Sequence, residues 1–186
     1  MAKAFETSFD RFACIDDTIE CASDGFQLVA TIKGDSGFYT PWDNDCSHGP
    51  VSEWSRRDKG PGELILCEAR GLKRFYDFQN ACRIALRDGW NCAPYDIAGE
   101  TKRQRAARAA RHDFEVLRGW CNDEWHYCGI VVTASLHGIG LGTASLWGIE
   151  CNYPGSDNAY LSEVANDLAS EAISEAQAMR AALVTQ

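Results

Sequence analysis

The sequence lacks a long apolar run. No stretch of about 18 consecutive apolar residues occurs in its 186 residues, and a membrane-spanning helix needs about 20, so we expect no membrane contact. Residues 1–10 mix charged and polar side chains without the apolar region of a signal peptide, so the cytoplasm is the expected compartment. Internal repeats are also absent. With 45% apolar and 24% charged residues, the chain has the composition of a globular protein that buries a core.

The cysteines lack the spacing of a metal or redox motif. There are nine, an odd number, and no two of them are separated by only two residues. A disulfide framework would also require a secretion signal. Cys67 in ELILCEA and Cys128 in WHYCGIVV lie instead within apolar strand patterns. We therefore expect reduced, mainly structural thiols, because free cysteine packs as a small apolar residue.

What the sequence does have is an uneven distribution of charge. Residues 1–53 carry a net charge of −7 and residues 54–118 carry +5, whereas residues 119–149 and 150–186 carry −2 and −5. The total is −9. A basic middle between two acidic flanks indicates recognition by charge, through one of two surfaces of opposite sign.

Residue periodicity predicts an α+β fold. We expect a largely antiparallel sheet of about five strands, with about three helices packed mainly on one face, in a single domain over 1–186. A long connection rich in Gly, Pro, Trp and Asp is expected at about 35–62, with a short helix that opens at Pro50 and ends at Gly60. The expected elements are a hairpin over 18–33, strands over 63–70, 127–136 and 143–151, and helices over 73–88, 101–118 and from about 157 onward. In the last helix, an apolar stripe is predicted from Leu161 through Met179 to Leu183.

The glycine-rich segment over 138–142 (GIGLG) resembles a phosphate-binding loop only superficially. Such a loop must open directly into a helix whose free amides face the phosphate. Here TASLWGIEC follows, which alternates as a strand. A flexible strand connection is the better interpretation, and no nucleotide cofactor is expected.

The segment from Asp43 to His48 (DNDCSH) places oxygen, sulfur and imidazole ligands within six residues. Asp43 and Asp45 suit a hard cation, while Cys46 and His48 suit zinc. A calcium loop is excluded, because its sixth position requires glycine and here holds His48. A zinc site needs further ligands that no regular spacing supplies. The alternative is a polar turn, so no metal ligand is assigned.

Two more residues bear on catalysis. Cys121 and His126 are close in sequence, but a thiol nucleophile needs a base in reach, which sequence proximity does not provide. We therefore lean against an enzyme and assign no catalytic residue. The alternative left open is a metal-assisted hydrolase or other enzyme that uses the Asp43–His48 cluster with one of them.

The helix expected over 101–118 carries the sharpest local charge. Its arginines either hold nucleic-acid phosphates or form a solvated face. The whole protein has a net charge of −9, which opposes nucleic-acid binding, so this remains a further alternative. The residues concerned are Arg103, Arg105, Arg108 and Arg111.

Acidic residues form the more extensive candidate surface. The last helix carries carboxylates at steps of four residues, and such like-charge spacing lowers helix stability by a few tenths of a kcal/mol per pair, roughly. Because the carboxylates occur at this spacing despite the loss of helix stability, the row favours a surface that binds a partner. Two tryptophans of the long connection are candidate anchors of that interface. The predicted partner-binding residues are Asp35, Trp42, Asp43, Asp45, Glu53, Trp54, Glu163, Asp167, Glu171 and Glu175.

Two segments resemble a known group of proteins. Residues 120–133 (WCNDEWHYCGIVVT) and 144–150 (ASLWGIE), followed by an acidic helix, resemble small acidic accessory proteins encoded by tailed bacteriophages and prophages. The similarity extends over about residues 75–175. It implies a phage protein in the bacterial cytoplasm, and such proteins include anti-CRISPR and antirestriction inhibitors of host defence.

Charge and resemblance together predict a non-enzymatic binding protein without a cofactor. It is expected to occupy the basic, nucleic-acid-binding surface of a host protein or nucleoprotein complex, such as a CRISPR effector or a restriction nuclease. A homodimer is left open.

Overall fold

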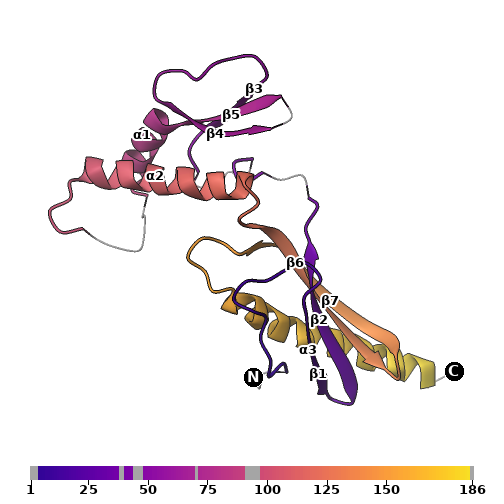
Figure 1. Ribbon diagram of the computed structural model, residues 1–186. Coiled ribbons are helices and arrows are strands. Elements are labelled where there is room, and N and C mark those ends of the chain that lie inside the picture. The colour runs from indigo at the N-terminus through magenta and orange to yellow at the C-terminus, as the bar shows by residue number, and fades with distance from the viewer. Residues whose placement is uncertain (1–3, 38–39, 44–47, 70, 91–96, 185–186) are drawn as a thin grey trace. The chain divides into compact units, whose positions relative to one another are not determined.

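A computed structural model of the chain describes residues 4–37, 40–43, 48–69, 71–90 and 97–184. Within these ranges lie three helices and seven strands, which confirms the α+β class (Figure 1). The strands form two antiparallel sheets of four and three strands, not the single sheet of about five that the sequence predicts. The chain divides into two compact units: unit 1 contains residues 1–36 and 125–186, and unit 2 contains residues 37–124. Whether both fold as one domain stays a prediction.

Unit 1 is a four-stranded sheet covered on one face by a long helix. Its strand order is β1-β2-β6-β7, and all neighbours are antiparallel. Since β2 pairs with β6, unit 2 is an insertion between two neighbouring strands of this sheet. The elements are β1 (Thr18–Ser23), β2 (Phe26–Gly34), β6 (His126–Leu136), β7 (Ile139–Cys151) and α3 (Ala159–Val184).

Two-residue turns close both hairpins of unit 1. Asp24 and Gly25 have φ values of 51° and 81°, and His137 and Gly138 have values of 50° and 81°. Positive φ at both positions is typical of type I′ turns, whose twist matches that of the strands. The predicted hairpin over 18–33 is therefore confirmed. Of the glycine-rich segment, only Gly138 belongs to this turn, and residues 139–142 are the start of β7.

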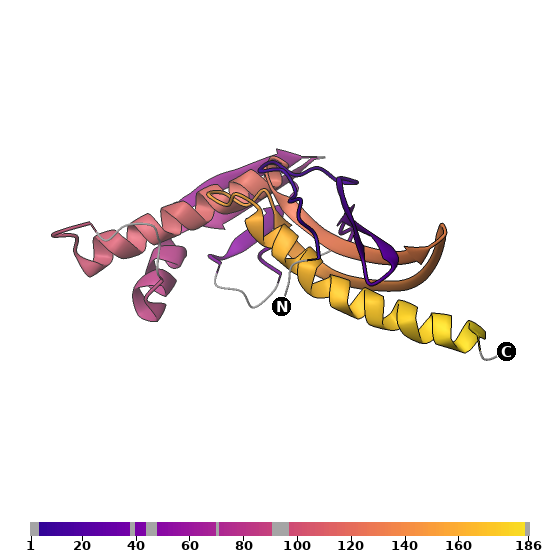
Figure 2. The same cartoon turned by 90° about the horizontal axis from the view of Figure 1, so that it is seen from below.

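The core of unit 1 lies between the sheet and α3 (Figure 2). Alternate side chains of β2 and β6 are buried against the stripe of α3 that runs from Leu161 to Ala176. The predicted continuation to Met179 and Leu183 is wrong, since these side chains are 48% and 62% exposed. The last turns of α3 pass beyond the end of the β6–β7 hairpin (Figure 2).

Close contact between α3 and β7 depends on small residues. A Cβ atom added to Gly142 would lie 2.6 Å from the backbone N of Ala176 and would overlap the carbonyl O of Ala172. No residue with a side chain fits at this position without a shift of the helix. Gly142 of the glycine-rich segment is thus a residue that allows close packing of α3 on β7.

An extended N-terminal segment, residues 5–13, also packs against the core. Phe5, Phe9 and Ala13 are buried at steps of four residues. The backbone N of Phe5 donates to Asn166 Oδ1 at 2.9 Å, and that of Phe9 donates to Ser162 Oγ at 3.0 Å. Side chains of α3 therefore fasten this segment, although it forms no helix or strand.

Unit 2 combines a three-stranded sheet, order β3-β5-β4, with two helices. Two sequence predictions are corrected here. The short helix expected from Pro50 is strand β3, and the helix expected from residue 73 begins only at Phe78, because the preceding residues pair with β4 as strand β5. The elements are β3 (Val51–Trp54), β4 (Glu63–Ala69), β5 (Leu72–Asp77), α1 (Phe78–Asp88) and α2 (Lys102–Cys121).

Helix caps mark where the helices of unit 2 begin. The Asp77 side chain accepts a hydrogen bond from the backbone N of Asn80 and thereby ends β5 and starts α1. Thr101 and Gln104 form a reciprocal capping box at the start of α2. The core of this unit joins Leu66 and Tyr76 of the sheet to the buried face of α2.

Candidate functional site

The two units differ sharply in charge. Unit 1 contains 13 aspartates and glutamates against 4 lysines and arginines, a net charge of −9. Unit 2 contains 14 of each and is neutral overall. The whole net charge of the protein therefore belongs to unit 1, and the basic middle of the sequence is balanced by acids within its own unit.

The carboxylate row of α3 is exposed, as its predicted role requires. Glu163, Asp167, Glu171 and Glu175 all have exposed side chains on the helix. Within the described residues, the first three make no side-chain hydrogen bond or ion pair. Glu175 differs, because its Oε2 accepts a hydrogen bond of 2.6 Å from the backbone N of Thr143 in β7. We call Glu163, Asp167 and Glu171 the α3 acidic row from here on.

Asp35, another predicted partner-binding residue, also bonds to β7. Its Oδ2 accepts a hydrogen bond of 3.1 Å from the backbone N of Gly148. β7 is an edge strand, and outward-facing amides at an edge invite pairing with another chain. Asp35 and Glu175 thus accept hydrogen bonds from backbone amides of β7, which is a structural role that the sequence did not reveal.

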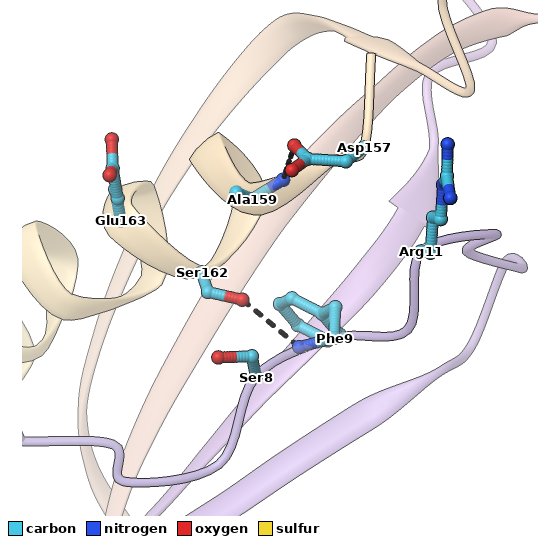
Figure 3. Close-up of a pocket in the computed structure, with 7 residues that line it drawn as sticks. All are labelled: Ser8, Phe9, Arg11, Asp157, Ala159, Ser162 and Glu163. Carbon is cyan, nitrogen blue, oxygen red and sulfur yellow. Dashed lines mark hydrogen bonds between the residues drawn. The ribbon is translucent and has the colours of Figure 1, made fainter.

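A shallow pocket of about 520 Å³ adjoins the first turn of α3 (Figure 3). Its polar groups are largely used within the protein: Ser162 accepts from the Phe9 amide, and Asp157 accepts from the backbone N of Ala159 at 3.0 Å. Glu163 points away from the hydrogen bond between Ser162 and Phe9 (Figure 3). The lining contains two carboxylates, Asp157 and Glu163, one arginine, Arg11, and no histidine or cysteine.

The remaining predicted residues of the long connection belong to unit 2. Trp42 is half-buried, with its ring 5.3 Å from that of Trp120 and the guanidinium of Arg74 at 5.5 Å. Glu53 Oε1 accepts from Arg74 Nε at 2.5 Å. These contacts make Trp42 and Glu53 parts of a packed cluster.

Three further predicted positions in this connection have different surroundings. Trp54 is 47% exposed, and Arg57 stacks on it at 4.8 Å. Asp43 forms a local turn in which its Oδ2 accepts from the backbone N of Thr40 at 3.2 Å. Asp45 lies outside the described residues.

Most of the predicted phosphate-binding arginines, which lie on α2, interact with other groups of unit 2. Arg108 makes two hydrogen bonds to Glu100, of 2.9 and 2.7 Å, and Arg105 lies 4.0 Å from the same carboxylate. The hydrogen bonds from Arg108 hold the pKa of Glu100 below its ordinary value. Arg111 stacks over Phe78 at 4.6 Å. Arg103 is exposed, so one of the four predicted phosphate-binding arginines has no such internal partner within the described residues.

Of the Asp43–His48 cluster, the structure describes Asp43 and His48, whereas Asp45 and Cys46 lie outside the described residues. His48 Nδ1 lies 2.5 Å from Asp113 Oδ1, 65 positions away in the chain. Asp113 is only 8% exposed, and its Oδ2 accepts from the backbone N of Gly49 at 2.7 Å and from the Tyr76 hydroxyl at 2.6 Å. Burial and the neighbouring Asp113 carboxylate raise the pKa of Tyr76.

This buried carboxylate orients His48 and joins three segments of unit 2. A carboxylate on Nδ1 fixes the imidazole tautomer, as it does in general-base sites. No group of three or more potential metal ligands occurs in the described part of the chain, which contains Asp43 and His48 but not residues 44–47. The sequence signal for Asp113 was a charged residue within the apolar stripe of α2, between Ala110 and Phe114.

The thiols also have defined neighbours. Cys121 belongs to unit 2 and His126 to unit 1, and Cys121 is in contact with Cys67 of β4. Cys128 and Cys151 form a second contacting pair, which is fully buried in the core of unit 1. All seven cysteines within the described ranges are free thiols.

Comparisons with protein-family models, with curated proteins and with solved structures find no match. None of the helices in the described ranges combines the length and apolar composition that a membrane crossing needs. The fold and surface define an α+β protein with one strongly acidic unit and one unit of balanced charge.

Proposed function

We propose that the protein is a non-catalytic binding protein that docks the α3 acidic row on a basic surface of a partner. The observation that carries this proposal is the segregation of charge: the net −9 belongs to unit 1, and α3 exposes three carboxylates that have no partner within the described residues. Long-range attraction to a basic partner then acts mainly through one unit.

The spacing of the row indicates which surface suits it. Residues four apart in a helix are separated by about 6 Å along the axis, so Glu163, Asp167 and Glu171 form a regular line of negative charge. A nucleic-acid backbone is also a regular line of negative charge. A basic groove that holds nucleic acid attracts both, and occupation by α3 would exclude the nucleic acid.

The resemblance to phage accessory proteins narrows the proposed partner. We propose a host-defence complex of the bacterial cytoplasm, either a CRISPR effector or a restriction nuclease, as the target. The nucleic-acid-binding alternative is weaker, because Arg105, Arg108 and Arg111 interact with Glu100 and aromatic rings inside unit 2.

Competition with DNA tests the proposal. Purified CRISPR effectors and restriction nucleases would be mixed with labelled DNA, and the protein added at increasing concentration over a range of salt. We expect at least one nuclease to release its DNA, with an inhibition that weakens as salt rises. A target that binds the protein and its DNA at the same time would contradict the proposed mode of action.

A matched pair of variants separates the α3 acidic row from net charge. The test variant carries Glu163→Gln, Asp167→Asn and Glu171→Gln, and the control carries Asp58→Asn, Glu68→Gln and Glu115→Gln in unit 2. Both change the net charge by three, and the control residues have exposed side chains. Only the test variant should lose inhibition.

A further inference from the structure

A pair of half-buried cysteines in unit 2, Cys67 and Cys121, has the features of a reactive dithiol. Cys67 is in β4, and Cys121 is the last residue of α2. Both are partly accessible to solvent, whereas Cys128 and Cys151 are fully buried. The two thiols lie close enough for Cys67 to affect the pKa of Cys121, although 53 residues separate them in the sequence.

A β-bulge directs Cys67 towards α2. Ile65 pairs with Phe75 and Cys67 pairs with Arg74, so Leu66 is an extra residue in β4. In a regular strand, Leu66 and Cys67 would point to opposite faces of the sheet. The bulge instead gives Cys67 the same face as Arg74, which is the face that packs against α2.

The buried stripe of α2 brings Cys121 to the same place. Ala110, Phe114 and Leu117 pack against Leu66 in one apolar cluster, and Cys121 continues this stripe at the end of the helix. The contact between the thiols is therefore fixed by packing on both sides.

Arg74 acts on both thiols. Its Nη1 donates to Cys67 Sγ at 3.6 Å, while Glu53 and the ring of Trp42 hold the guanidinium in place. A neighbouring cation stabilises a thiolate, which is the nucleophilic form of cysteine. Burial, followed by the contact with Cys67, raises the pKa of Cys121 to about 12, so Cys121 stays protonated at neutral pH.

We propose that Cys67 and Cys121 form a redox-sensitive pair that hydrogen peroxide converts to a disulfide in the folded protein. The Cys67 thiolate attacks one peroxide oxygen, the O–O bond breaks, hydroxide leaves, and a sulfenic acid forms. Cys121 then gives its proton to the released hydroxide and attacks the sulfenic sulfur. The S–O bond breaks as the S–S bond forms, and the hydroxide that leaves takes up the proton that Cys67 had lost. Two thiols lose two electrons and two protons in total, and one peroxide becomes two waters.

Peptide mapping of the full chain tests this pairing directly. The reduced, folded protein would be treated with hydrogen peroxide, alkylated in denaturant, and cut with trypsin and a glutamate-specific protease. These cleavages release Cys67 in residues 64–68 (LILCE) and Cys121 in residues 119–124 (GWCNDE). We expect these two peptides to be joined by a bond that dithiothreitol removes, and titratable thiols to fall from nine to seven.

Variants and an unfolded control complete the test. Cys67→Ser and Cys121→Ser should each abolish the joined peptide, Cys14→Ser should leave it unchanged, and Arg74→Gln should slow its formation at least about threefold. A bond between other cysteines would overturn the proposal. Formation as fast in urea as in the folded wild type would do so too, and this readout does not depend on any variant folding.

Discussion

Glu175 accepts a hydrogen bond of 2.6 Å from the backbone N of Thr143, which ties α3 to the edge strand β7. Glu175 is the last of four carboxylates that follow each other at steps of four along this helix. Like charges at that spacing repel, so each must have a reason to be kept. For Glu175 the reason lies inside the protein, and for the α3 acidic row we propose that it lies in a partner.

Loss of this bond should weaken unit 1. We expect Glu175→Ala to lower the free energy of unfolding by about 1 kcal/mol, because the Thr143 amide loses a charged acceptor. The control Glu171→Ala removes a carboxylate without such a bond and relieves repulsion, so its effect should stay within about 0.5 kcal/mol. Urea unfolding followed by far-UV circular dichroism measures both. Equal losses in the two variants would show that the bond does not stabilise the protein.

Gly142 should be the least replaceable glycine of β7. We expect Gly142→Ala to destabilise the protein by about 2 kcal/mol or more, because the new Cβ would press on the backbone of α3 at Ala172 and Ala176. Gly140→Ala is the matched control two residues earlier, where the nearest atom to a Cβ is 3.8 Å away on Thr133. Thermal unfolding of both variants decides the matter. Similar melting temperatures for the two would refute the close helix–strand contact.

Asp113 should dominate the stability of unit 2. We expect Asp113→Ala to cost about 3 kcal/mol, because the buried Gly49 amide would lose its acceptor and the Tyr76 hydroxyl would keep only the Ala110 carbonyl. Tyr76→Phe should cost about 1 kcal/mol, since it removes one donor and leaves the carboxylate with two others. His112→Ala, at an exposed neighbouring position, is the control. Urea unfolding followed by tryptophan fluorescence should rank the three variants in that order, and a small loss for Asp113→Ala would contradict it.

The ion pair between Glu100 and Arg108 predicts that the stability of the folded protein depends on pH. The pKa of Glu100 is lower in the folded protein than its ordinary value of 4.5. Such a carboxyl stabilises the fold above its unfolded pKa, and this contribution is lost as the pH falls through the folded pKa. The stability difference between wild type and Glu100→Gln should therefore be largest near pH 7 and should shrink below about pH 4.5. A constant difference over this range would rule out the pairing.

Local patterns predicted most elements correctly. Asp24-Gly25 marked a hairpin, and the stripes of α2 and α3 marked two helices, because turn chemistry and helical period are encoded within a few residues. For residues 73–77 the predicted helix was wrong, because they belong to strand β5. Phe75 continues the helical period of Phe78, yet pairing with β4 makes the segment a strand, and short-range pattern contains no information on that pairing.

The candidate site was predictable only in part. Exposure of the α3 acidic row followed from its position opposite the apolar stripe. The partners of His48 and Asp35 did not, because Asp113 and Gly148 lie 65 and 113 positions away in the chain. Contacts of this kind depend on the tertiary fold, which placed three of the predicted binding carboxylates, Asp35, Glu53 and Glu175, in structural roles.

One comparison tests the central claim most directly. Tagged wild type, the α3 row variant (Glu163→Gln, Asp167→Asn, Glu171→Gln) and the unit 2 control variant would each be used to capture partners from lysates of bacteria that carry CRISPR and restriction systems. We expect wild type and control to retain the same basic nuclease or CRISPR component, released by rising salt, and the α3 row variant to retain far less. Equal retention by all three proteins, or no nuclease retained by any, would contradict docking through α3.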